Sequence, residues 1–346
     1  MHILVTGGAG YLGSTVVPLL LEHDHRVTVV DRFYFGRDSL APAVGAHGDR
    51  LTLVQGDVRT LASASLAGVD AVVDLAGISN DPSCEIDPEL TKQVNMAGAI
   101  HLAHVAHAAG VRRFVFASSC SVYGHGQSRA LAEDSPLYPV SLYAQCKAEA
   151  ETRLFELGQA LGLEVTALRF ATLFGVSGRM RFDVAINVMT KNAYVARRIT
   201  VEGGGRQWRP FVHVRDVARL VLQVLGAPPE KVSGRVFNVG SDDNNVRILN
   251  LAYRVRDHVP GTEIVMSPTD PDLRDYNVCF DCVRRELGFS TEVSIDEGIE
   301  EVLQALRSGK LDPDDRHAYT LRQYVFLSEV ERTFQSLAID GHILSQ

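Results

Sequence analysis

The stretch ILVTGGAGYLGS, residues 3–14, joins an apolar run to three glycines, Gly7, Gly10 and Gly13. The apolar run predicts a buried strand, and the segment GSTVVPLLLEHD that follows predicts a helix. Between a strand and a helix, glycines allow a tight turn and the close approach of a pyrophosphate, to which the helix N-terminus offers backbone N–H groups. Because both flanking elements are present, the stretch predicts a dinucleotide-binding loop.

Strand-like runs alternate with helix-like segments through the first half of the chain. The runs are rich in β-branched and other apolar residues, and they lie at 2–7, 26–31, 51–57, 71–77, 112–119 and 163–170, with a further run at 234–241. Runs of this kind are typical of strands buried on both faces. Their alternation with helices predicts an α/β protein with a Rossmann-type, doubly wound parallel sheet.

The character of the sequence changes after Phe174, where a polar, cationic loop is followed by mixed short elements. We therefore predict a Rossmann domain over residues 1–173, completed by about 207–240, and a smaller C-terminal α/β substrate-binding region over 174–206 and 241–310. The remaining residues, 311–346, predict a helical tail that serves as a cap or as an oligomer contact.

Composition narrows the choice of partners. The chain has 346 residues and a formal net charge of −8, which disfavours binding to nucleic acid or to an anionic membrane surface. No apolar run is as long as a membrane span, and the chain opens directly into a strand, so we expect a cytoplasmic protein. The five cysteines predict free thiols, and the lone pair Cys279 and Cys282 lacks a second pair of ligands, so no metal site is predicted.

Two carboxylates extend the predicted cofactor site. Asp31 ends the second predicted strand, where a carboxylate accepts hydrogen bonds from the adenosine ribose and repels a 2′-phosphate. This position favours NAD over NADP, and the neighbouring Arg32 partly offsets the repulsion. Asp57 ends the third predicted strand at the same edge of the sheet, where ligands of open α/β folds bind.

A serine, a tyrosine and a lysine form a candidate catalytic set. Tyr143 and Lys147 are four residues apart in SLYAQCKAEAE, a predicted helix, and therefore lie on one face. A tyrosine that acts as a base near neutrality needs a cation that favours its phenolate, and Lys147 is placed to provide one. Ser119 ends the strand RRFVFASS, from which its hydroxyl can reach the same point.

Together these motifs resemble the extended short-chain dehydrogenase/reductase family, and within it the NAD-dependent nucleotide-sugar epimerases and dehydratases. The matching elements are TGGAGYLG, GDV, SSCSVYG, YAQCK, LRFATLFG and RPFVHVRDVA, which extend over nearly the whole chain to about residue 310. The resemblance implies that Tyr143 removes a proton from a sugar hydroxyl, usually O4, while the C4 hydride passes to NAD. Ser119 would hydrogen-bond the same oxygen, and Lys147 would bind the nicotinamide ribose.

The resemblance also implies further contacts. A homodimer would form through the helices around 91–110 and 141–161. Additional cofactor contacts would come from Tyr11, Leu12, Val58, Leu75, Ala76, Gly77, Asn95 and Phe170. Arg209 matches the arginine that family members place on the nucleotide pyrophosphate, a role suited to the planar guanidinium. The other substrate-binding candidates are Ser79, Ser121, Thr172, Arg179, Arg181, Asn187 and Arg274.

Two departures leave the nucleotide and the sugar open. Thr172 stands where the family usually has an asparagine, and the distal arginine of the common pattern is displaced to Arg274.

The two residues after Ser119 are Cys120 and Ser121. At these two positions, the family resemblance implies, 4,6-dehydratases have an Asp-Glu pair. In 3,5-epimerases of GDP-sugars an acid/base cysteine stands at the position of Ser121, and strand alternation would turn Cys120 to the other face.

Three functions are therefore considered. The leading hypothesis is an NDP-sugar C4 epimerase, or a related C4-oxidising enzyme, that acts through a 4-keto sugar. The second is a dehydratase or 3,5-epimerase that uses Cys120. The third is a non-catalytic dinucleotide sensor.

Overall fold

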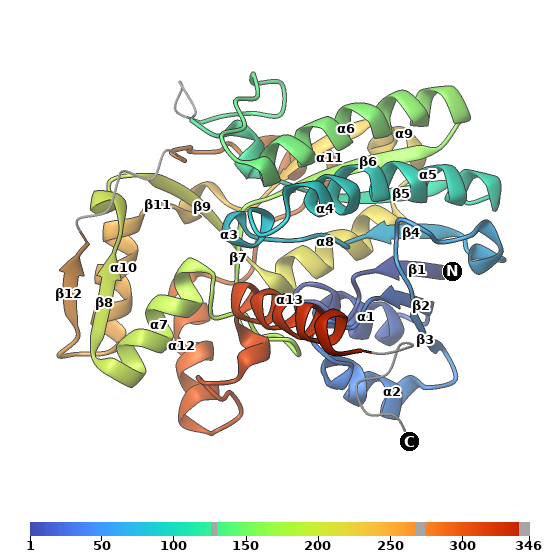
Figure 1. The fold of residues 1–346 in the computed structure, drawn as a ribbon. Coiled ribbons are helices and arrows are strands. Elements are labelled where there is room, and N and C mark those ends of the chain that lie inside the picture. The colour runs from blue at the N-terminus through green and yellow to red at the C-terminus, as the bar shows by residue number, and fades with distance from the viewer. Residues whose placement is uncertain (126–129, 268–273, 339–346) are drawn as a thin grey trace.

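A computed structural model describes residues 1–125, 130–267 and 274–338. Within them, the large sheet has seven parallel strands in the order β10-β6-β5-β4-β1-β2-β3 (Figure 1). Its strands are β1 (His2–Thr6), β2 (Arg26–Asp31), β3 (Leu51–Gln55), β4 (Ala71–Asp74), β5 (Arg113–Ser119), β6 (Glu164–Phe170) and β10 (Arg235–Val239). Each corresponds to an apolar run of the sequence, so the predicted Rossmann-type sheet is confirmed.

Helices cover both faces of the large sheet. The described residues form these helices, some of which belong to the smaller region: α1 (Gly13–Glu22), α2 (Ala41–His47), α3 (Asp81–Cys84), α4 (Pro88–Lys92), α5 (Ala99–Ala108), α6 (Leu142–Leu161), α7 (Ala185–Ala196), α8 (Val214–Gly226), α9 (Pro229–Val232), α10 (Ile248–His258), α11 (Asp281–Leu287), α12 (Ile295–Arg307) and α13 (Thr320–Leu337). Ile3 and Val5 of β1 join the core beneath α1 and α8, whereas Leu4 joins the core beneath α5 and α6. The strand alternation thus explains why these runs are continuously apolar.

A smaller region follows β6. In it, β7 (Thr172–Phe174), β9 (Trp208–His213) and β11 (Asn245–Arg247) form one sheet, and β8 (Arg198–Val201) pairs with β12 (Glu263–Met266). Helices α7, α10 and α12 share an apolar core with these strands. Of the segment 207–240, α8 and β10 join the large sheet, whereas β9 pairs with β7 and β11. Parts of the predicted substrate-binding region and tail, 268–273 and 339–346, lie outside the described residues.

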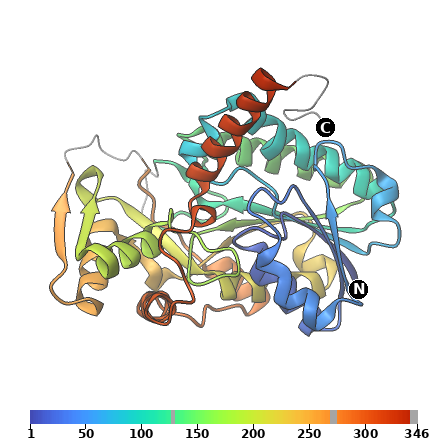
Figure 2. The same ribbon diagram turned by 60° about the horizontal axis from the view of Figure 1, so that its bottom comes forward.

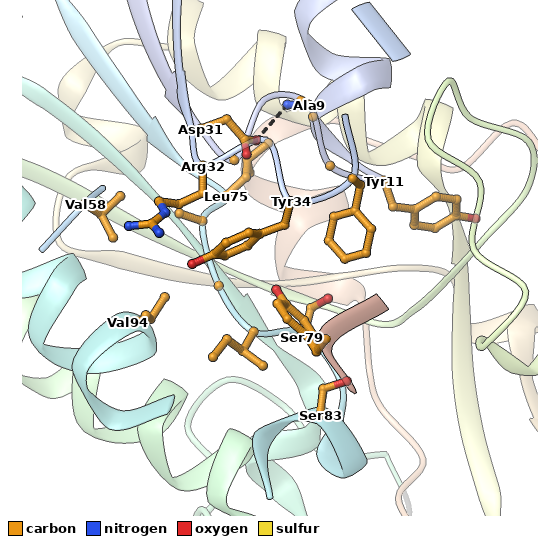
Figure 3. A pocket seen from close by; sticks show the side chains of 18 of the residues that line it. Ala9, Tyr11, Asp31, Arg32, Tyr34, Val58, Leu75, Ser79, Ser83 and Val94 are labelled. Atoms are coloured by element: carbon orange, nitrogen blue, oxygen red, sulfur yellow. Dashed lines mark hydrogen bonds between the residues drawn. The ribbon is translucent and has the colours of Figure 1, made fainter. Parts of the chain in front are cut away.

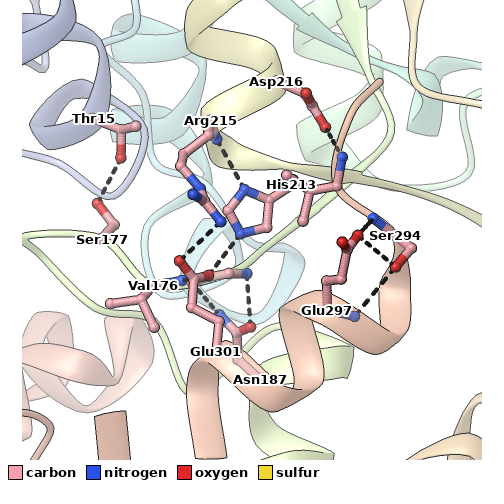
Figure 4. Close-up of polar contacts among 12 residues, drawn as sticks. Thr15, Val176, Ser177, Asn187, His213, Arg215, Asp216, Ser294, Glu297 and Glu301 are labelled. Atoms are coloured by element: carbon pink, nitrogen blue, oxygen red, sulfur yellow. Dashed lines mark hydrogen bonds and ion pairs between the residues drawn. The ribbon is translucent and has the colours of Figure 1, made fainter. Parts of the chain in front are cut away.

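One carboxylate joins three segments at the boundary of the two regions (Figure 4). Glu301 of α12 accepts hydrogen bonds from His213 Nε2 at 2.8 Å and from the backbone N–H of Val176 at 3.0 Å. Its second oxygen lies 3.3 Å from the guanidinium of Arg215. His213 Nδ1 accepts a hydrogen bond from the backbone N–H of Arg215 at 3.2 Å, so the proton of the imidazole is on Nε2. The Nε2–H group donates its hydrogen bond to Glu301. These contacts hold α12 against the end of β9.

Helix α13 lies outside the large sheet and approaches the carboxyl ends of its strands (Figures 1 and 2). Thr320 begins the helix, and its backbone N–H donates to Asp183 at 3.0 Å. Farther along, the helix contacts α3. Within the described residues, no helix combines the length and apolar character that crossing a membrane would require.

We expect Glu301→Ala to lower the free energy of unfolding by about 1–3 kcal/mol, because the variant leaves the partly buried donors of His213 and Val176 without an acceptor. Denaturant unfolding followed by circular dichroism measures this change. Gln304→Ala, on the exposed side of the same helix, is the control and should change the free energy by less than about 0.5 kcal/mol. Equal effects of the two substitutions would contradict this role of Glu301.

Candidate active site

A cavity of about 480 Å³ lies at the carboxyl ends of the strands of the large sheet. Figure 3 shows Asp31, Arg32 and Tyr34 at one end of it and Ser79 and Ser83 at the other. The predicted cofactor residues that line the cavity are Gly7, Gly10, Tyr11, Leu12, Gly13, Asp31, Arg32, Asp57, Val58, Leu75, Ala76, Gly77, Tyr143, Lys147 and Phe170. The sequence pattern and the cavity therefore agree at all but one predicted cofactor position.

The glycine loop packs so closely against neighbouring backbone that side chains would collide with it. Gly7 has a left-handed φ of +67°, and a Cβ there would lie 2.8 Å from the carbonyl oxygen of Leu75. A Cβ at Gly13 would lie 2.5 Å from the Cα of Gly8. Only glycine permits these approaches. The N-terminus of α1 consequently faces the cavity with its backbone N–H groups, which suits the pyrophosphate of a dinucleotide.

Asp31 lies at the wall of the cavity and orders the loops around it. Its carboxylate accepts the backbone N–H of Ala9 at 3.0 Å and that of Phe33 at 2.7 Å. Burial raises the pKa of Asp31, and the two backbone donors oppose this rise. A carboxylate at the end of β2 is placed to meet a ribose hydroxyl and disfavours a phosphate in the same position.

Arg32 forms an ion pair with a carboxylate of the protein, which bears on whether it could offset the repulsion of a 2′-phosphate by Asp31. Its guanidinium lies 3.0 Å from Asp57, which is also 2.7 Å from Arg59. Hydrogen bonding to Arg59, followed by the charges of both arginines, lowers the pKa of Asp57 to about 2. The positive charge of Arg32 is therefore partly neutralised within the protein.

Asn95 corrects one prediction. Its side chain is almost fully buried and pairs with both backbone groups of Ile78: Nδ2 donates to the carbonyl at 2.9 Å, and Oδ1 accepts the N–H at 2.8 Å. It is absent from the cavity wall. Asn95 therefore positions the loop that carries Gly77 and Ser79, because both polar groups of its side-chain amide pair with the backbone of Ile78.

Helix α6 places Tyr143 and Lys147 beside the end of β5. The hydroxyl of Ser141 caps the helix by accepting the Ala144 N–H at 3.3 Å, so Tyr143 stands in the first turn. Lys147, one turn later, is 4% exposed, and its Nζ lies 4.6 Å from the centre of the Phe116 ring. Ser119, the last residue of β5, lies close enough to Tyr143 to lower the pKa of its hydroxyl. Tyr143 and Lys147 thus line the cavity, with Ser119 beside Tyr143.

Burial dominates the electrostatics of this set. It raises the pKa of Tyr143, an effect strengthened by Cys84 and Asp81 and opposed by Arg181 and the hydrogen bond to Ser119. Burial also lowers the pKa of Lys147, whereas Asp74 favours its charged form. A low dielectric strengthens the interaction between a lysine cation and a phenolate that forms beside it. The Lys147 cation is therefore placed to favour the phenolate form of Tyr143.

Cys120 does not face the cavity, which corrects its proposed role as an acid or base. It begins a single helical turn after β5, is 1% exposed and belongs to the apolar core. Its Sγ donates to the carbonyl oxygen of Arg169 at 3.1 Å. Burial raises the pKa of the Cys120 thiol, so neither geometry nor acidity suits proton transfer to a ligand.

The predicted substrate residues divide into several groups. Ser79 and Arg181 line the cavity, and Arg181 is paired with Asp183 at 2.8 Å. Arg179 also lines it, but its guanidinium stacks 3.6 Å from the centre of the Phe35 ring, at the end beyond Asp31. Arg179 is therefore placed on the cofactor side, which differs from its prediction as a substrate-binding residue.

Asn187 and Thr172 do not line the cavity. Asn187 is fully buried; its Nδ2 donates to the Tyr11 hydroxyl at 2.9 Å, and its Oδ1 accepts the Gly175 N–H at 3.1 Å. It thereby holds the loop after β7 and has no free group for substrate, which corrects its predicted role. Ser121, by contrast, has a buried hydroxyl without a hydrogen-bond partner among the described residues.

Arg209 and Arg274 meet at the border of the smaller region. An Nη1 of Arg209 donates to the carbonyl of Arg274, and its guanidinium lies 5.0 Å from the centre of the Tyr276 ring. Arg274 also forms an ion pair with Asp81 of α3. Arg209, which the resemblance assigned to the substrate pyrophosphate, and the substrate-binding candidate Arg274 are thus neighbours in space.

Sequence reasoning missed several residues of the site. Asp81 Oδ1 and Ser83 Oγ are buried without a hydrogen-bond partner among the described residues, and Ser83 lines the cavity. Tyr34, Phe35 and four residues of α13 also line it. The polar turn SNDPS directly after β4 was an available signal for the first pair, because ligands bind at the carboxyl ends of parallel strands.

Comparison with known proteins assigns the family. Residues 3–240 match the NAD dependent epimerase/dehydratase family. The chain belongs to this family. The resemblance to extended short-chain dehydrogenases/reductases is confirmed, NAD is the cofactor, and the hypothesis of a non-catalytic sensor is set aside in favour of an enzyme.

Relatives of this epimerase/dehydratase family member cover almost the whole chain. A UDP-glucose 4-epimerase from Mycolicibacterium smegmatis is 30% identical over 318 residues, which are 89% of this chain and 99% of the relative. A dTDP-glucose 4,6-dehydratase from Streptomyces niveus is 28% identical over 322 residues, 90% of this chain and 94% of the relative. The structure of DesIV, a dTDP-glucose 4,6-dehydratase from Streptomyces venezuelae with NAD and TYD bound, has a TM-score of 0.80 at 28% identity and covers 90% of this chain and 99% of its own.

The ion pairs of Asp57 predict a pH dependence of stability. Its pKa is lowered in the folded protein, so the carboxylate stabilises the fold above its unfolded pKa of about 3.9, and the contribution is lost as pH falls from about 4 towards 2. We expect wild type to be more stable than Asp57→Asn by up to about 1 kcal/mol at pH 6, after allowance for solvent screening.

This difference should shrink as the pH falls below about 4. Urea unfolding at a fixed NAD concentration from pH 6 to pH 3 measures it, with the exposed Asp49→Asn as the matched control. A difference that grows on acidification would contradict the assignment.

Proposed function

We propose that this enzyme is an NDP-sugar C4 epimerase, or a related enzyme that oxidises C4, and that it acts through a 4-keto sugar. The observation that carries the proposal is that Tyr143 and Lys147 line the NAD cavity with Ser119 beside Tyr143, and that Cys120 and Ser121 follow Ser119 in place of two carboxylates. The 30% identical UDP-glucose 4-epimerase supports the same reaction class.

The chain supplies both the cofactor site and the groups that move the proton. Gly7, Gly13 and Asp31 would hold the dinucleotide, and bound NAD supplies the acceptor for a hydride from C4. Tyr143 acts as a phenolate that the Lys147 cation stabilises, takes the proton of the O4 hydroxyl and becomes a neutral phenol, while Ser119 hydrogen-bonds that oxygen. Removing the proton from O4 makes loss of the C4 hydride favourable, so the two events are coupled.

The substrate is proposed to lie between the cavity and the smaller region. Ser79 and Ser83 would contact the sugar, because both line the cavity near Tyr143. Arg209 would contact the nucleotide pyrophosphate, where a planar cation offers several donors. MoeE5, a protein of 26% identity solved with UDP-glucuronic acid and NAD, supports a nucleotide sugar as the substrate class.

A second candidate, elimination or epimerisation beside the keto group, is favoured by one observation. Asp81 has a buried carboxylate oxygen without a partner among the described residues, and its charge influences Tyr143. Such a group could accept a proton from a carbon next to the carbonyl. Several relatives are dehydratases, including the 26% identical NDP-hexosamine 5,6-dehydratase TunA. We therefore retain a dehydratase or 3,5-epimerase as the alternative, with Asp81 in place of Cys120 as the base.

We also propose that the enzyme is a cytoplasmic homodimer. Helices α5 and α6 lie side by side on one face of the large sheet (Figure 1) and would pair with their copies in a second subunit. The five free cysteines fit a reducing compartment.

Tyr143→Phe should reduce turnover with a cognate nucleotide sugar by about 10²–10⁴-fold, because the substitution removes the only proposed proton acceptor at O4. Stopped-flow absorbance at 340 nm follows the oxidation half-reaction directly. Tyr138→Phe, at a side chain that is 46% exposed, should keep wild-type rates. Wild-type oxidation by Tyr143→Phe would refute the mechanism.

Turnover in D2O separates the two reaction classes. C4 epimerisation should leave the sugar carbons without deuterium, because the hydride returns without exchange with solvent. Deuterium at C3 or C5, analysed by NMR, would instead establish the alternative, and its loss in Asp81→Asn but not in Cys120→Ala would identify the base. Loss only in Cys120→Ala would contradict the buried placement of that thiol.

A further inference from the structure

Helix α13 presents one face to the cofactor cavity. Tyr324, Leu327, Ser328 and Glu331 line the cavity, and they recur at the spacing of three and four residues that places side chains on one side of a helix. The side that faces away from the cavity carries exposed apolar residues, among them Val330 at 47%. The helix is therefore oriented with a defined face towards the cavity.

Tyr324 packs against the two aromatic residues that follow β2. Its ring meets that of Tyr34 edge-on at 5.8 Å between centroids, and that of Phe35 at 5.7 Å. The neighbouring Gln323 is 3% exposed and donates to the carbonyl oxygen of Tyr34 at 2.6 Å. Figure 3 shows Tyr34 beside Asp31, where the adenosine ribose of a dinucleotide would lie. Side chains from the two ends of the chain thus build one wall.

The first turn of α13 holds a buried cation at the same cavity. Thr320 Oγ1 accepts a hydrogen bond from Arg179 Nη2 at 3.1 Å, and the Arg179 ring contact with Phe35 fixes the guanidinium plane. Arg179 is 5% exposed, its Nε has no hydrogen-bond partner among the described residues, and no carboxylate among them forms an ion pair with it. A buried, unpaired guanidinium is costly unless an anion accompanies it.

The backbone places Arg179 next to the start of α1. Its N–H donates to the hydroxyl of Ser14 at 3.0 Å, and Ser14 follows Gly13 at the N-terminus of that helix. This is the position at which a dinucleotide pyrophosphate meets backbone N–H groups. The pyrophosphate is thus the anion of suitable charge and position for the guanidinium of Arg179.

We propose that α13 is a wall of the NAD site, in which Tyr324 closes the adenosine end and Thr320 holds Arg179 against the pyrophosphate, so that NAD stays bound between turnovers. The proposal rests on the binding of NAD and is independent of the C4 chemistry proposed above. A dinucleotide retained in this way suits a reaction without net oxidation of the substrate.

The test measures exchange of NAD and needs no sugar substrate. Full-length holoenzyme is freed of unbound nucleotide and mixed with excess isotopically labelled NAD, and the label in the protein fraction is followed by mass spectrometry. We expect Tyr324→Ala and Arg179→Gln each to exchange at least about ten-fold faster than wild type, a change that corresponds to a loss of about 1.4 kcal/mol. Tyr324→Phe retains the ring and should stay within about two-fold of wild type.

Val330→Ala is the matched control, because it removes an apolar side chain that faces away from the cavity on the same helix; it should exchange at the wild-type rate. Thermal unfolding of each variant shows whether it is folded. If Tyr324→Ala does not fold, Leu327→Ala tests the same wall. Wild-type exchange in folded Tyr324→Ala and Arg179→Gln, or equal acceleration in Val330→Ala, would overturn the proposal.

Discussion

Both regions of the molecule are organised around the left-handed turn at Gly7. Its φ is +67°, and a Cβ at this position would approach the Leu75 carbonyl oxygen to 2.8 Å, so only glycine fits. The turn brings the first loop against the end of β4 and opens the N-terminus of α1 towards the cavity. The same loop supports the smaller region, because the Tyr11 hydroxyl donates to the Gly175 carbonyl at 2.7 Å. Cofactor binding and the placement of loop 175–181 therefore share one structural origin.

A buried ion pair sets the position of the catalytic helix. Glu151 of α6 lies 2.7 Å from Arg169 of β6, and Ser118 of β5 donates to the same carboxylate. Such pairs contribute little net stability, but removing one partner leaves a buried charge. The contacts hold α6 against the ends of β5 and β6, which keeps Tyr143 and Lys147 beside the last residue of β5. A small shift of α6 would separate the tyrosine from Ser119.

Local patterns were sufficient for the strands, the glycine loop and the Tyr143–Lys147 pair, because each depends on spacing along a short segment. Roles that depend on hydrogen-bond partners were harder to predict. Asn95 and Asn187 have the side-chain chemistry of ligand contacts, but their amides pair with backbone groups of the protein. Cys120 has a reactive side-chain type, and its burial follows from the turn that the chain makes after β5.

The α/β fold, the dinucleotide loop and the candidate catalytic set could all be read from the amino-acid order, since they depend on periodicity, on backbone freedom at glycine and on one helical turn. The packing of the folded chain decided which candidate residues line the cavity and which position the loops around it. The packing also assigned Arg179 to the cofactor side and brought Tyr324 to Tyr34 and Phe35. These contacts join residues that are far apart in the chain, and no local pattern specifies how distant segments pack.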